Sequence, residues 1–94
     1  MKQTYSKANE IVTAVVYKYL AVGYQFSLQT MSGFQKIDLM KDRTLIRIEI
    51  DYDKNGEYEV VVRKKITDMS HYLIGDYVPT VFSKDMETVE EIKI

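Results

Sequence analysis

The chain has 94 residues, a net charge of −1 and no cysteine. Its length fits one domain with a small core, and 46% apolar with 29% charged residues is typical of a globular protein. The near-neutral charge argues against nucleic acid as the sole ligand, and the lack of cysteine excludes disulfides, thiolate nucleophiles and zinc ribbons.

A membrane segment or secretion signal is not expected. The longest apolar stretch, residues 11–22, contains Lys18 and is too short to span a bilayer. Glu10 and Lys18 also interrupt the region that would form the apolar part of a signal peptide. We therefore expect a cytoplasmic protein in which residues 1–94 form a single domain.

The first predicted element is a helix over residues 6–22. Ser6 is a suitable N-cap, and Gly23 stands where a left-handed glycine commonly ends a helix. Tyr17 lies opposite the apolar face. Because β-branched residues weaken this helix, we expect it to pack on a sheet. Its apolar face comprises Ala8, Ile11, Val12, Val15, Tyr19 and Val22.

Residues 24–29, 35–40, 44–53 and 58–66 alternate between apolar and polar side chains, which predicts four strands. Pairing Leu39 with Ile46 places Asp38 opposite Arg47. This agreement of apolar and charged positions predicts an antiparallel pair whose charged residues face solvent. The same register pairs Ile37 with Ile48 and Lys36 with Glu49.

Residues 51–59 support two interpretations. Oxygen side chains at every second position, followed by Gly56, resemble the first half of a calcium loop. The twelfth position of that loop is Val62 rather than a glutamate, and both flanks have strand periodicity. A three-residue hairpin loop ending at Gly56 instead pairs Ile50 with Val60 and keeps every inward position apolar, Tyr52 opposite Tyr58 included.

The predicted hairpin has opposite charges at its two ends. At its tip like charges face each other, which solvent, a cation or a basic partner could relieve. Such a polarised face suits the orientation of a protein partner. Alternatively, the acidic tip binds a cation or small ligand, or the basic end binds nucleic acid weakly. The tip carries Asp51 opposite Glu59 and Asp53 opposite Glu57; the basic end carries Arg43, Arg47, Arg63, Lys64 and Lys65.

The C-terminal part leaves alternatives open. Residues 73–78 fit a tight hairpin, and Pro79 confines that segment to a sheet edge or a bulge. Ser83 could cap a short helix that carries Met86 and Val89. Residues 88–94 fit a strand equally well.

The sequence offers little for catalysis. His71 is the single histidine, the carboxylates cluster at a turn, and no glycine-rich phosphate loop occurs. We therefore predict a protein that is not an enzyme, with no cofactor and no catalytic or metal-binding residues. The chain is rich in tyrosine, and Tyr17 is a candidate interface residue because exposed tyrosine favours interfaces.

Residues 24–34, 36–39 and 44–50 resemble segments of small uncharacterised accessory proteins of Gram-positive phages and conjugative elements. This resemblance implies a protein that binds a host protein, a class that includes inhibitors of CRISPR nucleases; it carries over no site residues.

We predict an α+β domain whose N-terminal helix packs on one face of a four- or five-stranded antiparallel meander sheet. The predicted function is a non-enzymatic protein-interaction module, and the sequence has no signal for oligomeric state. Candidate partner-binding residues are Tyr17, Arg43, Asp51, Asp53, Glu57, Glu59, Arg63 and Lys65.

Overall fold

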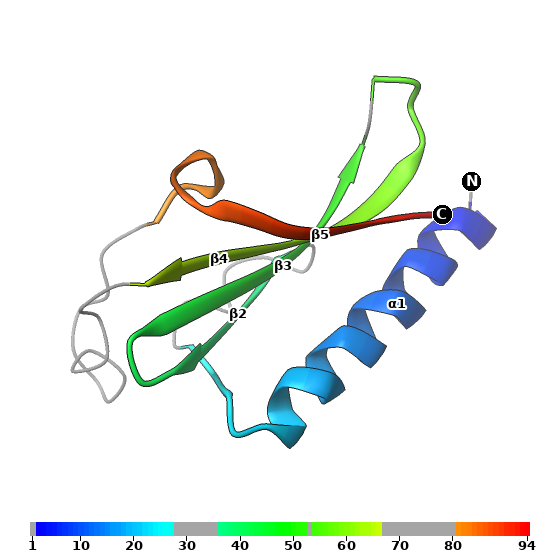
Figure 1. The fold of residues 1–94 in the computed structure, drawn as a ribbon. Helices are drawn as coiled ribbons and strands as arrows, with labels where there is room; N and C mark the ends of the chain where they lie inside the picture. Colours follow the sequence, from blue (N-terminus) through cyan, green and yellow to red (C-terminus); the bar gives the residue numbers. More distant parts are fainter. Residues whose placement is uncertain (1, 28–35, 53, 67–80) are drawn as a thin grey trace.

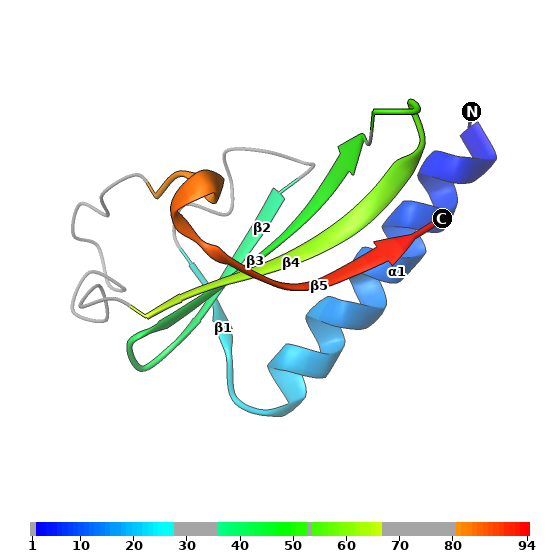
Figure 2. The same ribbon diagram turned by 45° about the horizontal axis from the view of Figure 1, so that its top comes forward.

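A computed structural model describes residues 2–27, 36–52, 54–66 and 81–94, and it confirms the α+β prediction. One helix packs against one face of a five-stranded antiparallel sheet (Figures 1 and 2). The strands lie side by side in chain order, as a meander requires. The elements are α1 (Lys2–Ala21), β1 (Gln25–Phe26), β2 (Lys36–Lys41), β3 (Thr44–Tyr52), β4 (Tyr58–Ile66), the 3₁₀ turn η3 (Ser83–Asp85) and β5 (Glu87–Lys93).

Helix α1 begins earlier than predicted. It starts at Lys2, so Ser6 lies inside the helix and is not its N-cap. No proline or glycine precedes Ser6, so the sequence contains nothing that would stop the helix from beginning there. Within the predicted apolar face, Ala8, Val12 and Val15 are buried and Ile11 and Tyr19 are partly buried against the core, whereas Val22 follows the last helical residue and is 56% exposed. Val16 is also buried.

The end of α1 confirms the left-handed glycine. Gly23 has φ +102°, and its N–H donates to the carbonyl of Leu20 at 3.1 Å. The N–H of Tyr24 donates to the carbonyl of Tyr19 at 3.2 Å, which completes a Schellman motif. The rings of Tyr19 and Tyr24 meet edge to face at 5.2 Å, so the chain leaves the helix in a fixed direction.

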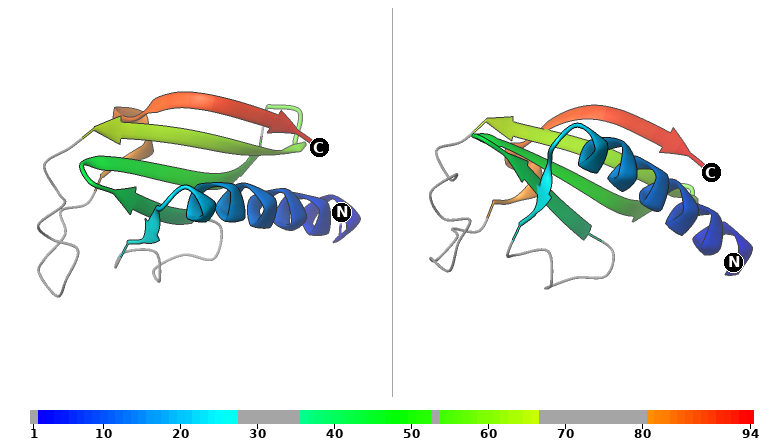
Figure 3. Two further views of the ribbon diagram at one scale, coloured as in Figure 1. Left: turned by 60° about the horizontal axis from the view of Figure 1, so that its bottom comes forward. Right: turned by 90° about the horizontal axis from the view of Figure 1, so that it is seen from below.

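The main core lies between α1 and the sheet, where α1 crosses β3 and β4 (Figure 3). The predicted registers are confirmed: Leu39 faces Ile46 across β2 and β3, and Ile50 faces Val60 across β3 and β4. Gly56 in the connecting loop has φ +77°, the left-handed conformation predicted for it. Buried residues of this core are Ala8, Val12, Val15, Val16, Leu39, Ile46, Ile48, Ile50, Val60 and Val62.

The tip of the β3–β4 hairpin departs from the predicted inward pattern. Tyr52 faces Tyr58 as predicted, but its side chain is 56% exposed. The two rings stack with centroids 4.4 Å apart, and their hydroxyls form a hydrogen bond of 2.5 Å. Tyr52 therefore packs on its cross-strand neighbour rather than in the core.

The sheet face opposite α1, called here the distal face, is covered at one end. Met40, Leu45, Val81 and Met86 form a second apolar cluster on it. The prediction that Asp38 and Arg47 face solvent is therefore wrong: the two residues are 4% and 2% exposed. The alternation of the strands was right, but a segment distant in sequence packs over this face.

The last described segment resolves the alternative left open for the C-terminus. Residues 83–85 form one 3₁₀ turn, whose N-cap Phe82 makes no side-chain capping bond, and β5 follows at Glu87. The predicted helix capped by Ser83 is therefore wrong, and the predicted strand is confirmed. Of the strand predicted over residues 24–29, the structure has Gln25–Phe26 as β1, and residues 28 and 29 lie outside the described residues. Residues 28–35, 53 and 67–80 lie outside the described residues, including the hairpin predicted for residues 73–78.

Candidate functional site

An apolar groove runs along α1 beside the β1 side of the sheet. Tyr17 stands on its rim, 67% exposed, and Phe26 contributes a ring that is 54% exposed. The groove encloses about 250 Å³. Phe26 lines the groove together with residues of α1, and about half of its surface remains uncovered. The lining residues are Val12, Thr13, Val16, Tyr17, Leu20, Phe26 and Ile37.

The sequence pattern explains this groove. Tyr17 lies opposite the buried face of α1, as predicted, and it borders the groove together with Thr13 and Leu20. Among the described residues, strand β1 comprises two, whereas β3 and β4 comprise nine each. Helical periodicity could identify Tyr17 as exposed. The exposure of Phe26 depends on where β1 ends, and alternation alone does not show that.

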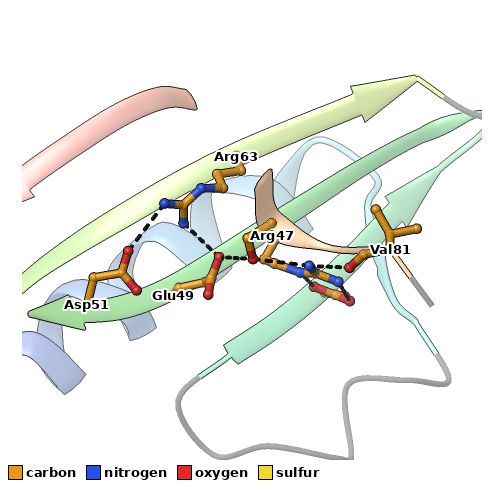
Figure 4. A network of polar contacts seen from close by, with 7 residues as sticks. Arg47, Glu49, Asp51, Arg63 and Val81 are labelled. Atoms are coloured by element: carbon orange, nitrogen blue, oxygen red, sulfur yellow. Dashed lines mark hydrogen bonds and ion pairs between the residues drawn. The ribbon is translucent and has the colours of Figure 1, made fainter. Parts of the chain in front are cut away.

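A network of polar contacts occupies the distal face (Figure 4). Arg47 donates from Nε to Asp38 Oδ1 at 2.8 Å and from Nη2 to Asp38 Oδ2 at 2.9 Å. Its Nη1 donates to the carbonyl of Val81 at 2.6 Å and to Ser83 Oγ at 3.3 Å. The bidentate pair satisfies the buried carboxylate, and the remaining contacts fix the chain that leads into β5.

Arg63 extends the network toward the hairpin tip. It donates to Glu49 Oε1 at 2.6 Å and to Asp51 Oδ2 at 3.2 Å. The hydroxyl of Ser83 donates to the same Glu49 oxygen at 2.6 Å. Arg63 therefore belongs to a structural network rather than to a free basic surface. The roles of Glu49 and Ser83 were not predicted. Glu49 is diagonal to Arg63 in the confirmed register, and this position could have identified it as a partner of Arg63.

The acidic hairpin tip has basic partners within the chain. Asp51 faces Glu59, as predicted. Asp51 pairs with Arg63, and Glu59 Oε2 lies 3.4 Å from Lys93 Nζ. The like charges are therefore each compensated by a cation from a neighbouring strand. Lys93 was missed because its place depends on the β4–β5 pairing, which the sequence left open.

The remaining predicted site residues are scattered. Arg43 is exposed in the turn between β2 and β3, and Glu57 is exposed in the β3–β4 loop. Lys65 is half-buried on β4 opposite Leu45. Asp53 lies outside the described residues. The structure thus brings Asp51 and Arg63 together, and it separates both from Tyr17, which lies on the other side of the sheet.

Among the described residues, the pKa values of Arg47 and Tyr19 depart from their ordinary range. Burial alone lowers the pKa of Arg47, but the hydrogen bonds to Asp38 and the charges of Asp38 and Glu49 outweigh it, so this pKa is raised. The pKa of Tyr19 is raised by burial, then by Tyr24 and by the charge of Glu90. Arg47 therefore stays a cation at every pH at which the protein folds.

Neither shift identifies a proton-transfer site, because Arg47 is fully engaged and Tyr19 packs on Tyr24. Within residues 2–27, 36–52, 54–66 and 81–94, no three His, Asp or Glu side chains are grouped to hold a metal ion. The helix described here is not long and apolar enough to cross a membrane. Comparison with family models, with curated proteins and with solved structures gave no match.

Proposed function

We propose that this chain is a non-enzymatic protein-interaction module that binds its partner through the groove along α1. The observation that carries the proposal is the pair of exposed aromatic rings, Tyr17 and Phe26, on an otherwise apolar groove. At about 250 Å³ the groove is smaller than usual small-molecule sites, which span roughly 300–1,000 Å³. Its size suits one or two anchoring side chains of a protein partner.

The charged hairpin gives less support to the two alternative functions, which are cation or ligand binding at its tip and nucleic-acid binding at its basic end. Asp51 and Glu59 already have cationic neighbours, so a bound metal is not needed to relieve their repulsion. Arg47 and Arg63 are committed to carboxylates, which removes two cations from the basic end that nucleic acid would use. The partner class follows the resemblance noted above: a host enzyme, such as a CRISPR nuclease, inhibited by a mobile-element accessory protein.

A photo-crosslinking experiment tests the groove. A benzophenone amino acid at position 17 is expected to crosslink one partner in a host lysate, and the same group at Lys18 serves as the matched control on the adjacent helix face. The double variant Tyr17→Ser/Phe26→Ser should lose at least tenfold in affinity for that partner, because aromatic anchors dominate interface energies. Unchanged binding by a folded double variant would rule the groove out.

A further inference from the structure

Strand β5 is the outermost strand of the described sheet on the β4 side. No described strand pairs with its outer edge, and six of its seven residues are exposed. Figure 3 shows β5 along the rim of the sheet, away from β3. An uncovered edge presents backbone N–H and C=O groups that can accept a further strand.

The backbone orientation of this edge follows from one hydrogen bond. The N–H of Ile94 donates to the carbonyl of Tyr58 on β4 at 3.3 Å. Backbone groups alternate in direction along an antiparallel strand, so Ile92 also faces β4, whereas Glu91 and Lys93 direct their N–H and C=O groups outward. The β4–β5 register agrees with this orientation, because Lys93 lies opposite Glu59 and Ile92 lies opposite Val60.

The side chains of this edge are acidic. Glu87, Glu90 and Glu91 are exposed, and none of them forms an ion pair with another described residue. Lys93 is directed to Glu59, so its charge is compensated within the sheet. The net charge that β5 presents to an approaching chain is therefore negative.

A second copy of this chain does not fit this edge well. Antiparallel pairing of all seven residues of β5 with those of a second copy places Glu90 opposite Glu90, although Glu87 then faces Lys93. A shift by two residues places Glu91 opposite Glu91. Like charges directly opposite each other destabilise a sheet, so these glutamates oppose self-association in both registers. The register shift between Val62 and Arg63, which leaves Val89 without a partner on β4, further limits regular pairing to the C-terminal half of β5.

We propose that the outer edge of β5 binds a basic segment of a partner protein in extended conformation, which adds a sixth strand beside Glu90–Lys93. The backbone groups of Glu91 and Lys93 would form the new ladder, and lysine or arginine side chains of the partner would lie against Glu90 and Glu91. The outer edge of β5 and the groove at Tyr17 are separate surfaces, so each proposal can fail while the other holds.

The test uses a fluorescent eight-residue peptide of alternating lysine and valine and the full chain. Anisotropy should show saturable binding that weakens as salt rises. The same peptide N-methylated at every residue has the same charge but no N–H to donate to the ladder, and it should bind at least tenfold more weakly. On peptide binding, the amides of Glu91 and Lys93 should become protected from hydrogen exchange.

Two variants at one position separate backbone from charge. Glu91→Pro removes an outward N–H while the β4–β5 ladder keeps its own bonds, and it should weaken peptide binding by about five- to tenfold beyond the effect of Glu91→Gln. Thermal melts of both variants verify that the fold is retained. Equal binding of the two peptides, equal binding by the two variants, or no binding at low salt would overturn the proposal.

Discussion

Arg47 and Asp38 face each other across β2 and β3 and form a two-bond ion pair that is sealed from solvent. Removal of one partner leaves the other charge buried. Arg47→Met should therefore destabilise the fold by about 3–5 kcal/mol, whereas Arg47→Met combined with Asp38→Leu should recover most of that loss. Urea unfolding of both proteins measures the difference. Wild-type stability of the single variant would contradict the buried pair.

The second apolar cluster can be tested on the same strand. Met40 is 1% exposed beneath the segment that contains Val81 and Met86. Met40→Ala should cost about 2–5 kcal/mol, as expected for a core methionine. On a solvent-facing strand the same change would cost less than about 0.5 kcal/mol. Thr88→Ala, an exposed substitution on β5, provides the control in the same denaturant series.

The hairpin loop depends on glycine at one position. Gly56 has φ +77°, and an added Cβ would meet no atom within 4 Å, so the effect of substitution is purely conformational. Gly56→Ala should cost about 1–2 kcal/mol. Gly56→Asn should cost less, because asparagine tolerates the left-handed region. Equal melting temperatures for the wild type and the alanine variant would refute this conformation.

Calcium should not stabilise the protein. Asp51 and Glu59 already lie beside Arg63 and Lys93, so a bound cation would have to displace existing ion pairs. Millimolar calcium should leave the melting temperature unchanged, since a ligand that binds the folded state would raise it. Magnesium at equal ionic strength controls for screening. A rise with calcium alone would restore the metal-binding function of the tip.

Alkaline pH should weaken the fold through Tyr19. Its pKa is raised in the folded state, mainly by burial, so the folded protein holds the phenol proton more tightly than the unfolded chain. The stabilising contribution is complete below the ordinary tyrosine pKa of about 10 and is lost as pH rises through the folded value. Between about pH 8 and pH 11, Tyr19→Phe should lose less stability than the wild type. Chemical denaturation at both pH values measures this difference.

The strand pairing could be predicted because it depends on neighbouring segments. Ile46 and Leu39, or Ile50 and Val60, lie a few residues apart across a turn, and one register satisfies both the apolar and the charged positions. The predicted start of α1 was too late, because a serine such as Ser6 can cap a helix but does not prevent the helix from beginning earlier. The capping preference of serine is outweighed when no helix breaker precedes it.

The environment of the distal face could not be predicted. Alternation reports that Asp38 and Arg47 share a face, but not what covers that face. The cover comes from Val81, which is 34 residues beyond Arg47 in the chain. The groove could be predicted only in part. Helical periodicity identified Tyr17 as exposed, whereas the exposure of Phe26 depends on the length of β1.

The bond from Arg47 to the Val81 carbonyl also has a consequence for the order of folding. Strands β2, β3 and β4 pair through short loops, so their contacts form at little entropic cost. Closure of the chain between Arg47 and Val81 is the longer-range step. Until it occurs, the guanidinium lacks its third acceptor and Met40 and Leu45 are exposed. We therefore expect an early folding intermediate in which β2, β3 and β4 are paired and Arg47 is still hydrated. The burial of Arg47 should coincide with the docking of β5.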